Sequence, residues 1–92
     1  MCYVSVTIKV ENYARWKAAF DFKSAARKES GSKEAHLFRN YKDQNEVMIL
    51  FKWDNLQKAQ KYMESDEIRK YLKDVDAEIV NITYLSEQEI SV

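Results

Sequence analysis

Three side chains of this sequence could carry acid–base or anion-binding chemistry. His36 is the only histidine, and an ordinary histidine pKa of about 6.5 suits a general base near neutral pH. It falls in the middle of a predicted strand, so its use depends on whether it faces a neighbouring layer of helices. A solvent-exposed or fully hydrogen-bonded strand histidine is the structural alternative.

Lys23 and Arg27 lie one helical turn apart in a predicted helix. On a helical wheel Lys23 falls inside the apolar arc, so its charge would point toward the sheet. Together the two cations could bind a carboxylate or an enolate at the mouth of a helix–sheet cleft. The alternative is that both side chains extend to solvent near the helix C-terminus, where the helix dipole also favours cations.

Several aromatic side chains could line a pocket for a flat apolar ligand. They occur at helical and strand spacings, so they could equally fill a hydrophobic core. The candidates are Trp16, Phe20, Phe38, Phe51, Trp53 and Tyr62.

The first half of the chain predicts a strand followed by a helix. Residues 2–10 alternate polar and apolar side chains, which is typical of a strand with one covered face. Asn12 has the type and position of a helix N-cap, and the helix is predicted to run to about Ser30. Gly31 then supplies the left-handed position that ends it.

The second half predicts two more strands, a helical region and a final strand. Residues 34–42 and 46–53 would form a hairpin around Asp43-Gln44-Asn45. Asp54, with Gln57 three residues later, is predicted to cap a helix, and Ser65 or Asp66 to start another. Residues 78–86 alternate again and predict the last strand.

This β-α-β-β-α-β order predicts one α+β domain over residues 1–92, a ferredoxin-like sandwich. Both helical regions would lie on one face of a four-stranded antiparallel sheet. The strand 46–53 is apolar on both sides, so the face away from the helices also needs a cover. We expect a homodimer packed sheet against sheet, with the tail 87–92 either loose or crossing to the partner.

Composition excludes several classes of function. Fifteen basic and fifteen acidic side chains balance, so no overall field attracts nucleic acid or an anionic membrane. No run approaches the roughly 18 apolar residues of a membrane span, and no signal-peptide pattern is visible. The single cysteine, Cys2, favours a cytoplasmic location. With one cysteine and one histidine, we expect no metal site.

The chain resembles a known group in its hairpin, cap and core-aromatic positions: Asn45-Glu46-Val47, Phe51-Lys52-Trp53-Asp54, Ala59, and Ser65-Asp66 before a short helix. These residues resemble the dimeric α+β barrel superfamily, and within it the antibiotic biosynthesis monooxygenase-like proteins. The resemblance implies a dimeric barrel and cofactor-free oxidation of an aromatic or polyketide-like molecule. Many members of the superfamily have no assigned activity, so a non-catalytic dimeric small-molecule-binding or regulatory module is the alternative.

Under the enzyme hypothesis the polar catalytic candidates are His36 and Lys23. The ligand-contacting candidates are Trp16, Phe20, Arg27, Phe51 and Tyr62. The haem-degrading branch of the superfamily uses a helical histidine, and the matching position here is Leu72. Its strand-one asparagine also has no counterpart within residues 2–10, so we expect no haem and no other cofactor.

Overall fold

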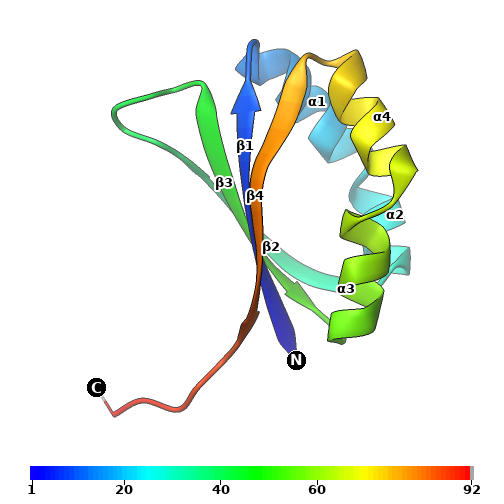
Figure 1. Cartoon of the computed structure of the whole chain (residues 1–92), viewed down its shortest axis with the longest axis vertical. Helices are drawn as coiled ribbons and strands as arrows, with labels where there is room; N and C mark the ends of the chain where they lie inside the picture. The colour runs from blue at the N-terminus through cyan, green and yellow to red at the C-terminus, as the bar shows by residue number, and fades with distance from the viewer. Residues whose placement is uncertain (92) are drawn as a thin grey trace.

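The computed structural model describes residues 1–91 and contains four strands and four helices (Figure 1). In chain order they are β1 (Cys2–Val10), α1 (Tyr13–Phe22), α2 (Ser24–Glu29), β2 (Ser32–Arg39), β3 (Glu46–Trp53), α3 (Leu56–Met63), α4 (Asp66–Asp74) and β4 (Ala77–Ser86). The predicted order is confirmed, with each helical region divided into two helices. Within the described residues, no helix is long and apolar enough to cross a membrane.

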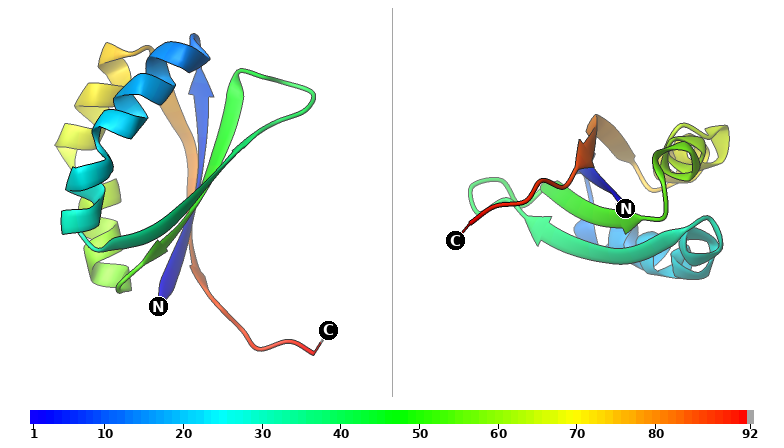
Figure 2. Two further views of the ribbon diagram at one scale, coloured as in Figure 1. Left: turned by 180° about the vertical axis from the view of Figure 1, so that it is seen from behind. Right: turned by 90° about the horizontal axis from the view of Figure 1, so that it is seen from below.

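The strands form one antiparallel sheet in the order β2-β3-β1-β4, so β1 and β3 are central. All four helices cover the same face of the sheet, and the other face is left open (Figures 1 and 2). This arrangement confirms the ferredoxin-like α+β class. It places every helical side chain that could form a site on one side of the sheet.

The hydrophobic core lies between the sheet and the helices. Alternating residues of the two central strands meet there: Val4 stands opposite Phe51, and Val6 opposite Ile49. The helices add Trp16, Phe20, Ala59, Met63, Ile68 and Leu72, all buried. Burial of each large apolar side chain contributes about 1.5–3 kcal/mol, so this layer supplies the main stabilising contacts of the domain.

The prediction of one continuous helix up to Ser30 is wrong. The backbone leaves helical geometry at Lys23, with φ −86° and ψ 5°, and α2 sets off in a new direction. Phe22, which the helical wheel was also taken to place in the apolar arc, is 84% exposed, because two residues after the buried Phe20 it lies on the opposite side of α1. Gly31 does end the helical region, and its φ of +112° is a conformation that glycine adopts easily.

The helix caps are partly as predicted. Asn12 caps α1 and Ser65 caps α4, each accepting a hydrogen bond from a backbone N–H in the first turn. The cap of α3, however, is Asn55 rather than Asp54, because the Asn55 side chain accepts from the Lys58 amide at 2.9 Å. Asp54 instead pairs with the ammonium groups of Lys33 and Lys58.

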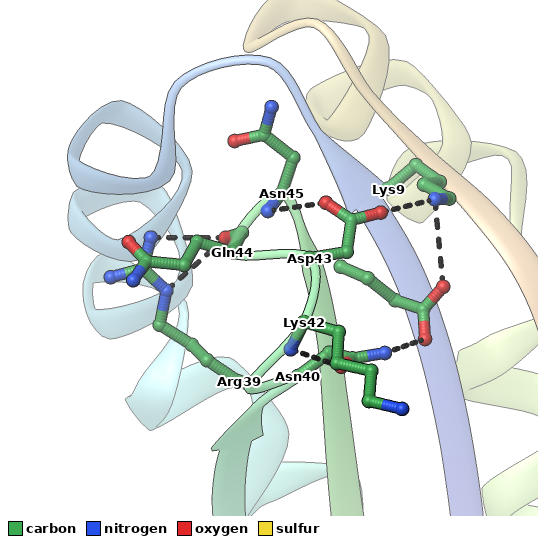
Figure 3. A network of polar contacts seen from close by, with 8 residues as sticks. Lys9, Arg39, Asn40, Lys42, Asp43, Gln44 and Asn45 are labelled. Carbon is green, nitrogen blue, oxygen red and sulfur yellow. Dashed lines mark hydrogen bonds and ion pairs between the residues drawn. The ribbon is translucent and has the colours of Figure 1, made fainter.

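The hairpin between β2 and β3 is held by its own polar side chains (Figure 3). Asp43 accepts from the Asn45 amide at 3.0 Å and from Lys9 of β1 at 2.8 Å. Arg39 donates to the Gln44 carbonyl and lies 3.9 Å from the centre of the Tyr13 ring. Residues 43–45 form the predicted turn, and the Lys9 and Tyr13 contacts also tie the hairpin to β1 and α1.

Candidate functional site: a cleft between α2 and the α3–α4 pair

A cleft of about 470 Å³ opens on the helical side of the molecule, between α2 on one wall and α3 and α4 on the other. Its lining mixes cationic, phenolic and apolar side chains. The lining residues are Lys23, Ala26, Glu29, Ser30, Lys58, Lys61, Tyr62, Ser65, Glu67, Ile68 and Tyr71.

The corner between α3 and α4 brings two tyrosines to the same wall. The Ser65 hydroxyl donates to the Tyr62 carbonyl at 2.8 Å and accepts from the Ile68 amide at 3.4 Å. It therefore closes the last turn of α3 and opens the first turn of α4. Tyr62 on α3 and Tyr71 on α4 consequently both line the cleft.

Lys23 stands at the break between α1 and α2, on the opposite wall. Its Nζ lies 5.5 Å from the centre of the Tyr71 ring, within the range of a cation–π contact. The charge thus reaches across the cleft toward α4. Lys23 was expected to point toward the sheet, and it does not because the backbone leaves helical geometry at this residue.

Arg27 is buried, with 7% of its surface exposed. Its Nη1 donates to the Phe20 carbonyl at 2.6 Å, and its guanidinium carbon lies 3.8 Å from the centre of the Phe20 ring. This carbonyl belongs to the last turn of α1, where it also accepts from the Lys23 amide at 3.3 Å. Arg27 therefore fixes the end of α1 and places a positive charge deep between the helices.

The two tyrosines of the cleft remain protonated well above neutral pH. Burial raises the pKa of Tyr71 to about 12. Burial also raises the pKa of Tyr62, and the Arg27 charge opposes this effect at both residues. Both hydroxyl groups can consequently donate hydrogen bonds to a ligand in the cleft.

The aromatic residues predicted to contact a ligand lie mostly in the core. Trp16 stacks on Phe20 with ring centres 5.1 Å apart, and Phe20 meets Phe51 at 6.2 Å. Trp53 continues this cluster to Tyr62 at 5.2 Å. Of the predicted aromatic contacts, only Tyr62 reaches the cleft; Trp16, Phe20 and Phe51 support it from below.

His36 is not part of the cleft. It pairs with Leu50 across β2 and β3, so it lies on the open face of the sheet, and its side chain is 60% exposed. Its nearest charged partner is Glu34, at 3.8 Å. The role of base required a position facing the helices, and the register of β2 does not provide it.

The structure thus brings together three of the predicted site residues, Lys23, Arg27 and Tyr62. It adds Tyr71 of α4, which was not among the predicted site residues; its spacing from Ile68 and its position next to Leu72 indicate only the apolar face of this helix. A tyrosine at the edge of an apolar helix face could have indicated this position, because its hydroxyl needs water or a hydrogen-bond partner. Over residues 1–91, no group of three or more His, Cys, Asp or Glu side chains is placed to hold a metal ion.

Comparisons with known proteins agree with this architecture. Residues 1–74 match the model of the family described as antibiotic biosynthesis monooxygenase. No curated protein matches the chain.

Solved structures share the fold at low sequence identity. SnoaB, a cofactor-independent oxygenase from Streptomyces nogalater, superposes with a TM-score of 0.75 at 10% identity, covering 97% of this chain and 94% of that one. A provisionally assigned antibiotic biosynthesis monooxygenase from Deinococcus radiodurans gives 0.69 at 16% identity, covering 100% and 97%. Another from Bordetella bronchiseptica gives 0.73 at 13% identity, covering 98% and 97%. At such identities the likeness shows the fold alone.

Proposed function

The chain belongs to the antibiotic biosynthesis monooxygenase family, and from that premise we propose that it is a small homodimeric, cofactor-independent oxygenase of an aromatic or polyketide-like molecule. The observation that carries the proposal is the cleft between α2, α3 and α4. It joins cations and protonated phenols to an apolar wall, which suits a flat substrate that reacts as an anion.

The proposed reaction converts an activated CH₂ group into a carbonyl. The substrate loses a proton, and the resulting carbanion donates electrons to O₂ to form a hydroperoxide at that carbon. Loss of water then gives C=O, so one O₂ is consumed and one H₂O is released. The carbanion is the state that needs stabilising, and Lys23 with Arg27 would lower the pKa of the substrate by stabilising its charge.

The cleft residues divide the remaining tasks. Tyr62 and Tyr71 would donate hydrogen bonds to the oxygen on which the negative charge accumulates. Among the lining residues, Glu29 and Glu67 supply carboxyl groups that could act as the proton acceptor. A carboxylate is a weak base, so the substrate we expect is itself acidic, such as a phenolic ketone with a doubly activated CH₂ group.

The proposed homodimer uses the open face of the sheet. Phe38, Met48 and Leu85 are 50%, 43% and 41% exposed there. Cross-strand pairing puts Met48 next to Phe38, and Leu85 next to Tyr3, on one face. The C-terminal segment leaves the domain on the side away from the helices, where a partner would sit (Figures 1 and 2). A second copy would cover this apolar surface, and the lone cysteine favours a cytoplasmic location for the dimer.

Oxygen consumption tests the proposed activity. A dihydroxyanthrone, which has an acidic CH₂ group between aromatic rings, serves as the probe substrate. We expect O₂ uptake and quinone absorbance above the spontaneous rate. Tyr71→Phe and Lys23→Gln should each lower the catalysed rate by about tenfold, the effect of removing one interaction worth about 1.4 kcal/mol in the transition state. Lys42→Gln, in the exposed hairpin, is the matched control, and a wild-type rate equal to the spontaneous rate would overturn the proposal.

A non-catalytic dimeric binding or regulatory module is the second candidate. It is favoured by the aromatic cluster of Trp16, Phe20 and Phe51, whose rings fill the space between α1 and the sheet. A ligand would then be confined to the outer cleft. Saturable binding of a panel of polycyclic phenols and ketones, each without O₂ uptake, would support this candidate over the enzyme.

A further inference from the structure

We infer that the cleft between α2, α3 and α4 selects an aromatic carboxylate, held by Lys23, Tyr62 and Tyr71 in front of the buried Arg27. The inference rests on the proposed use of this cleft as the ligand site, and it adds the charge and class of the ligand. Four observations carry it: a buried cation without a counter-ion, the charges of the lining, the phenol donors, and an apolar wall.

The guanidinium of Arg27 lacks an acidic partner inside the described chain. Over residues 1–91, no carboxylate lies within ion-pairing distance of it. It donates from Nη1 to the Phe20 carbonyl and is also in hydrogen-bonding contact with the neutral phenol of Tyr62. A buried charge is costly unless it is paired, and removal from water makes an opposite charge correspondingly favourable. Arg27 therefore favours an anion in its surroundings.

The charged side chains that line the cleft are also positive in sum. Three lysines stand against two glutamates, and Arg27 behind them adds a fourth positive charge. Lys58 is partly neutralised by Asp54 at 3.6 Å. Lys23 and Lys61 form no ion pair with any residue in the range 1–91. A concave surface with an excess of one sign concentrates ligands of the other sign.

The positive charge of Arg27 also strengthens the hydrogen bonds that the two tyrosines can donate to a ligand. Arg27 lies close enough to Tyr62 and Tyr71 to stabilise their ionised forms, which makes their protonated hydroxyls stronger donors. A carboxylate has two oxygens and several acceptor positions, so it could accept from both hydroxyls and from the Lys23 ammonium. Such charge-assisted bonds are roughly twice as strong as neutral ones.

The apolar part of the ligand has a place as well. Ile68, Ala26 and the face of Tyr71 supply the apolar side of the cleft. A flat ring stacked on Tyr71 would direct an attached carboxylate toward Lys23, which already lies over that ring at 5.5 Å. A neutral ring would gain the stacking and leave the cations uncompensated. A cationic ring would meet repulsion from Lys23 and Lys61.

A purely structural role for Arg27 makes the opposite prediction. In that case the bond to Phe20 and the stacking on its ring are the whole function of the side chain, and the cleft has no preference for charge. The two accounts differ in one measurable quantity, the ratio of affinities for an acid and its neutral isostere.

The decisive experiment is calorimetric titration of the purified full chain with 2-naphthoate and with 2-naphthamide. The two probes share ring and shape and differ in charge. We expect the acid to bind about tenfold more tightly, since a charged hydrogen bond exceeds a neutral one by roughly one power of ten in affinity. Added NaCl should lower the affinity for 2-naphthoate and leave the affinity for 2-naphthamide unchanged. Amide chemical shifts on titration should change at Lys23, Ser65 and Tyr71.

Variants assign the selectivity to residues. Lys23→Gln and Lys61→Gln should each lower the affinity for the naphthoate about fivefold and leave the affinity for the naphthamide unchanged, and both variants keep the Arg27 side chain and its bond to the Phe20 carbonyl. Arg27→Lys keeps the charge and should retain most of the selectivity, whereas Arg27→Gln should abolish it. Lys42→Gln in the hairpin controls for total charge. If Arg27→Gln fails to fold, the two lysine variants still decide the question.

Each outcome is informative about a different claim. Equal affinities for the acid and the amide, with shifts in the cleft, would overturn the anion inference and leave the cleft as a ligand site. Shifts confined to the open face of the sheet, or no binding of either probe, would overturn the inference together with the proposed site. Selective binding of the acid without any oxygenase activity would support the inference and count against the enzyme.

Discussion

The indole of Trp53 donates a hydrogen bond of 2.9 Å from Nε1 to the carbonyl oxygen of Ser30. This bond joins the end of β3 to the end of α2. The next residue, Gly31, lies directly against the same ring, and its own carbonyl accepts from the Asp54 amide at 3.0 Å. One wall of the cleft is thereby anchored to the centre of the sheet.

Replacement of Gly31 by alanine should destabilise the fold by about 2–4 kcal/mol. An added Cβ would stand 3.0 Å from Trp53 Nε1, and the φ of +112° is unfavourable for any side chain. The free energy of unfolding from urea denaturation measures the loss. Ser30→Ala keeps the carbonyl that Trp53 uses and should change stability by less than about 0.5 kcal/mol. A Gly31→Ala protein of wild-type stability would contradict the packing seen around this ring.

Alkaline pH should weaken the fold between about pH 10 and 12. The folded-state pKa of Tyr71 is raised to about 12 by burial, and that of Tyr84 to about 12 by burial and by its hydrogen bond to Glu64. A raised phenol pKa means that the unfolded chain loses its proton first. The associated stability is thus fully present below pH 10 and lost as pH rises toward 12.

Spectrophotometric titration of tyrosinate measures this effect directly. Among the six tyrosines, Tyr71 and Tyr84 should ionise later in the folded protein than in urea, and the pKa of Tyr62 is shifted in the same direction. Tyr71→Phe should remove one late step and reduce the alkaline loss of stability, by on the order of 1–2 kcal/mol. A folded protein whose six tyrosines all titrate together near pH 10 would argue against the buried position of Tyr71.

Features set by neighbouring residues were predicted well from the sequence. The alternation of residues 2–10 identified Val4, Val6 and Ile8 as core, and each is buried. Asn12 was identified as a cap and Gly31 as the end of the helical region, and of the two residues predicted to start the last helix, Ser65 or Asp66, Ser65 is its cap. In each case the residue type and its immediate context carry the physical cause, so no long-range information was needed.

Features set by packing between distant segments were not predicted. The break at Lys23 accompanies a bond from the Arg27 side chain to the Phe20 carbonyl, a contact that residue types alone do not predict. Strand β2 mixes polar and apolar residues, so its facing was undetermined until the register with Leu50 fixed His36 on the open side. Lys23, Arg27 and Tyr62 were predicted as site residues because their charge or hydroxyl is unusual among apolar neighbours; Lys23 and Tyr62 line the cleft, and Arg27 is buried next to it.

The choice between two adjacent caps gives a direct test of this distinction. Asn55→Ala should cost about 1 kcal/mol, because it removes the acceptor for the Lys58 amide. Asp54→Ala should cost less than about 0.5 kcal/mol, since it removes only surface ion pairs. Urea midpoints of the two variants compare them in the same background. A larger loss of stability for Asp54→Ala than for Asn55→Ala would indicate that Asp54 caps α3, as the sequence predicted.

The open face of the sheet should be the dimer interface, and a single charge should disrupt it. Met48 is 43% exposed, lies on a central strand and stands opposite Phe38 and Thr7. In an isolated chain Met48→Glu leaves its carboxylate in water, so the fold should persist by circular dichroism. In a dimer the same carboxylate would be buried without a partner, at a cost of several kcal/mol. The molecular mass measured by sedimentation should therefore fall from twice 10.9 kDa in the wild type to the mass of one chain in the variant.

The control is Leu56→Glu, at a residue that is similarly exposed (46%) but lies on α3. This variant should stay dimeric. A wild-type protein that sediments as a single chain at micromolar concentration would exclude this interface.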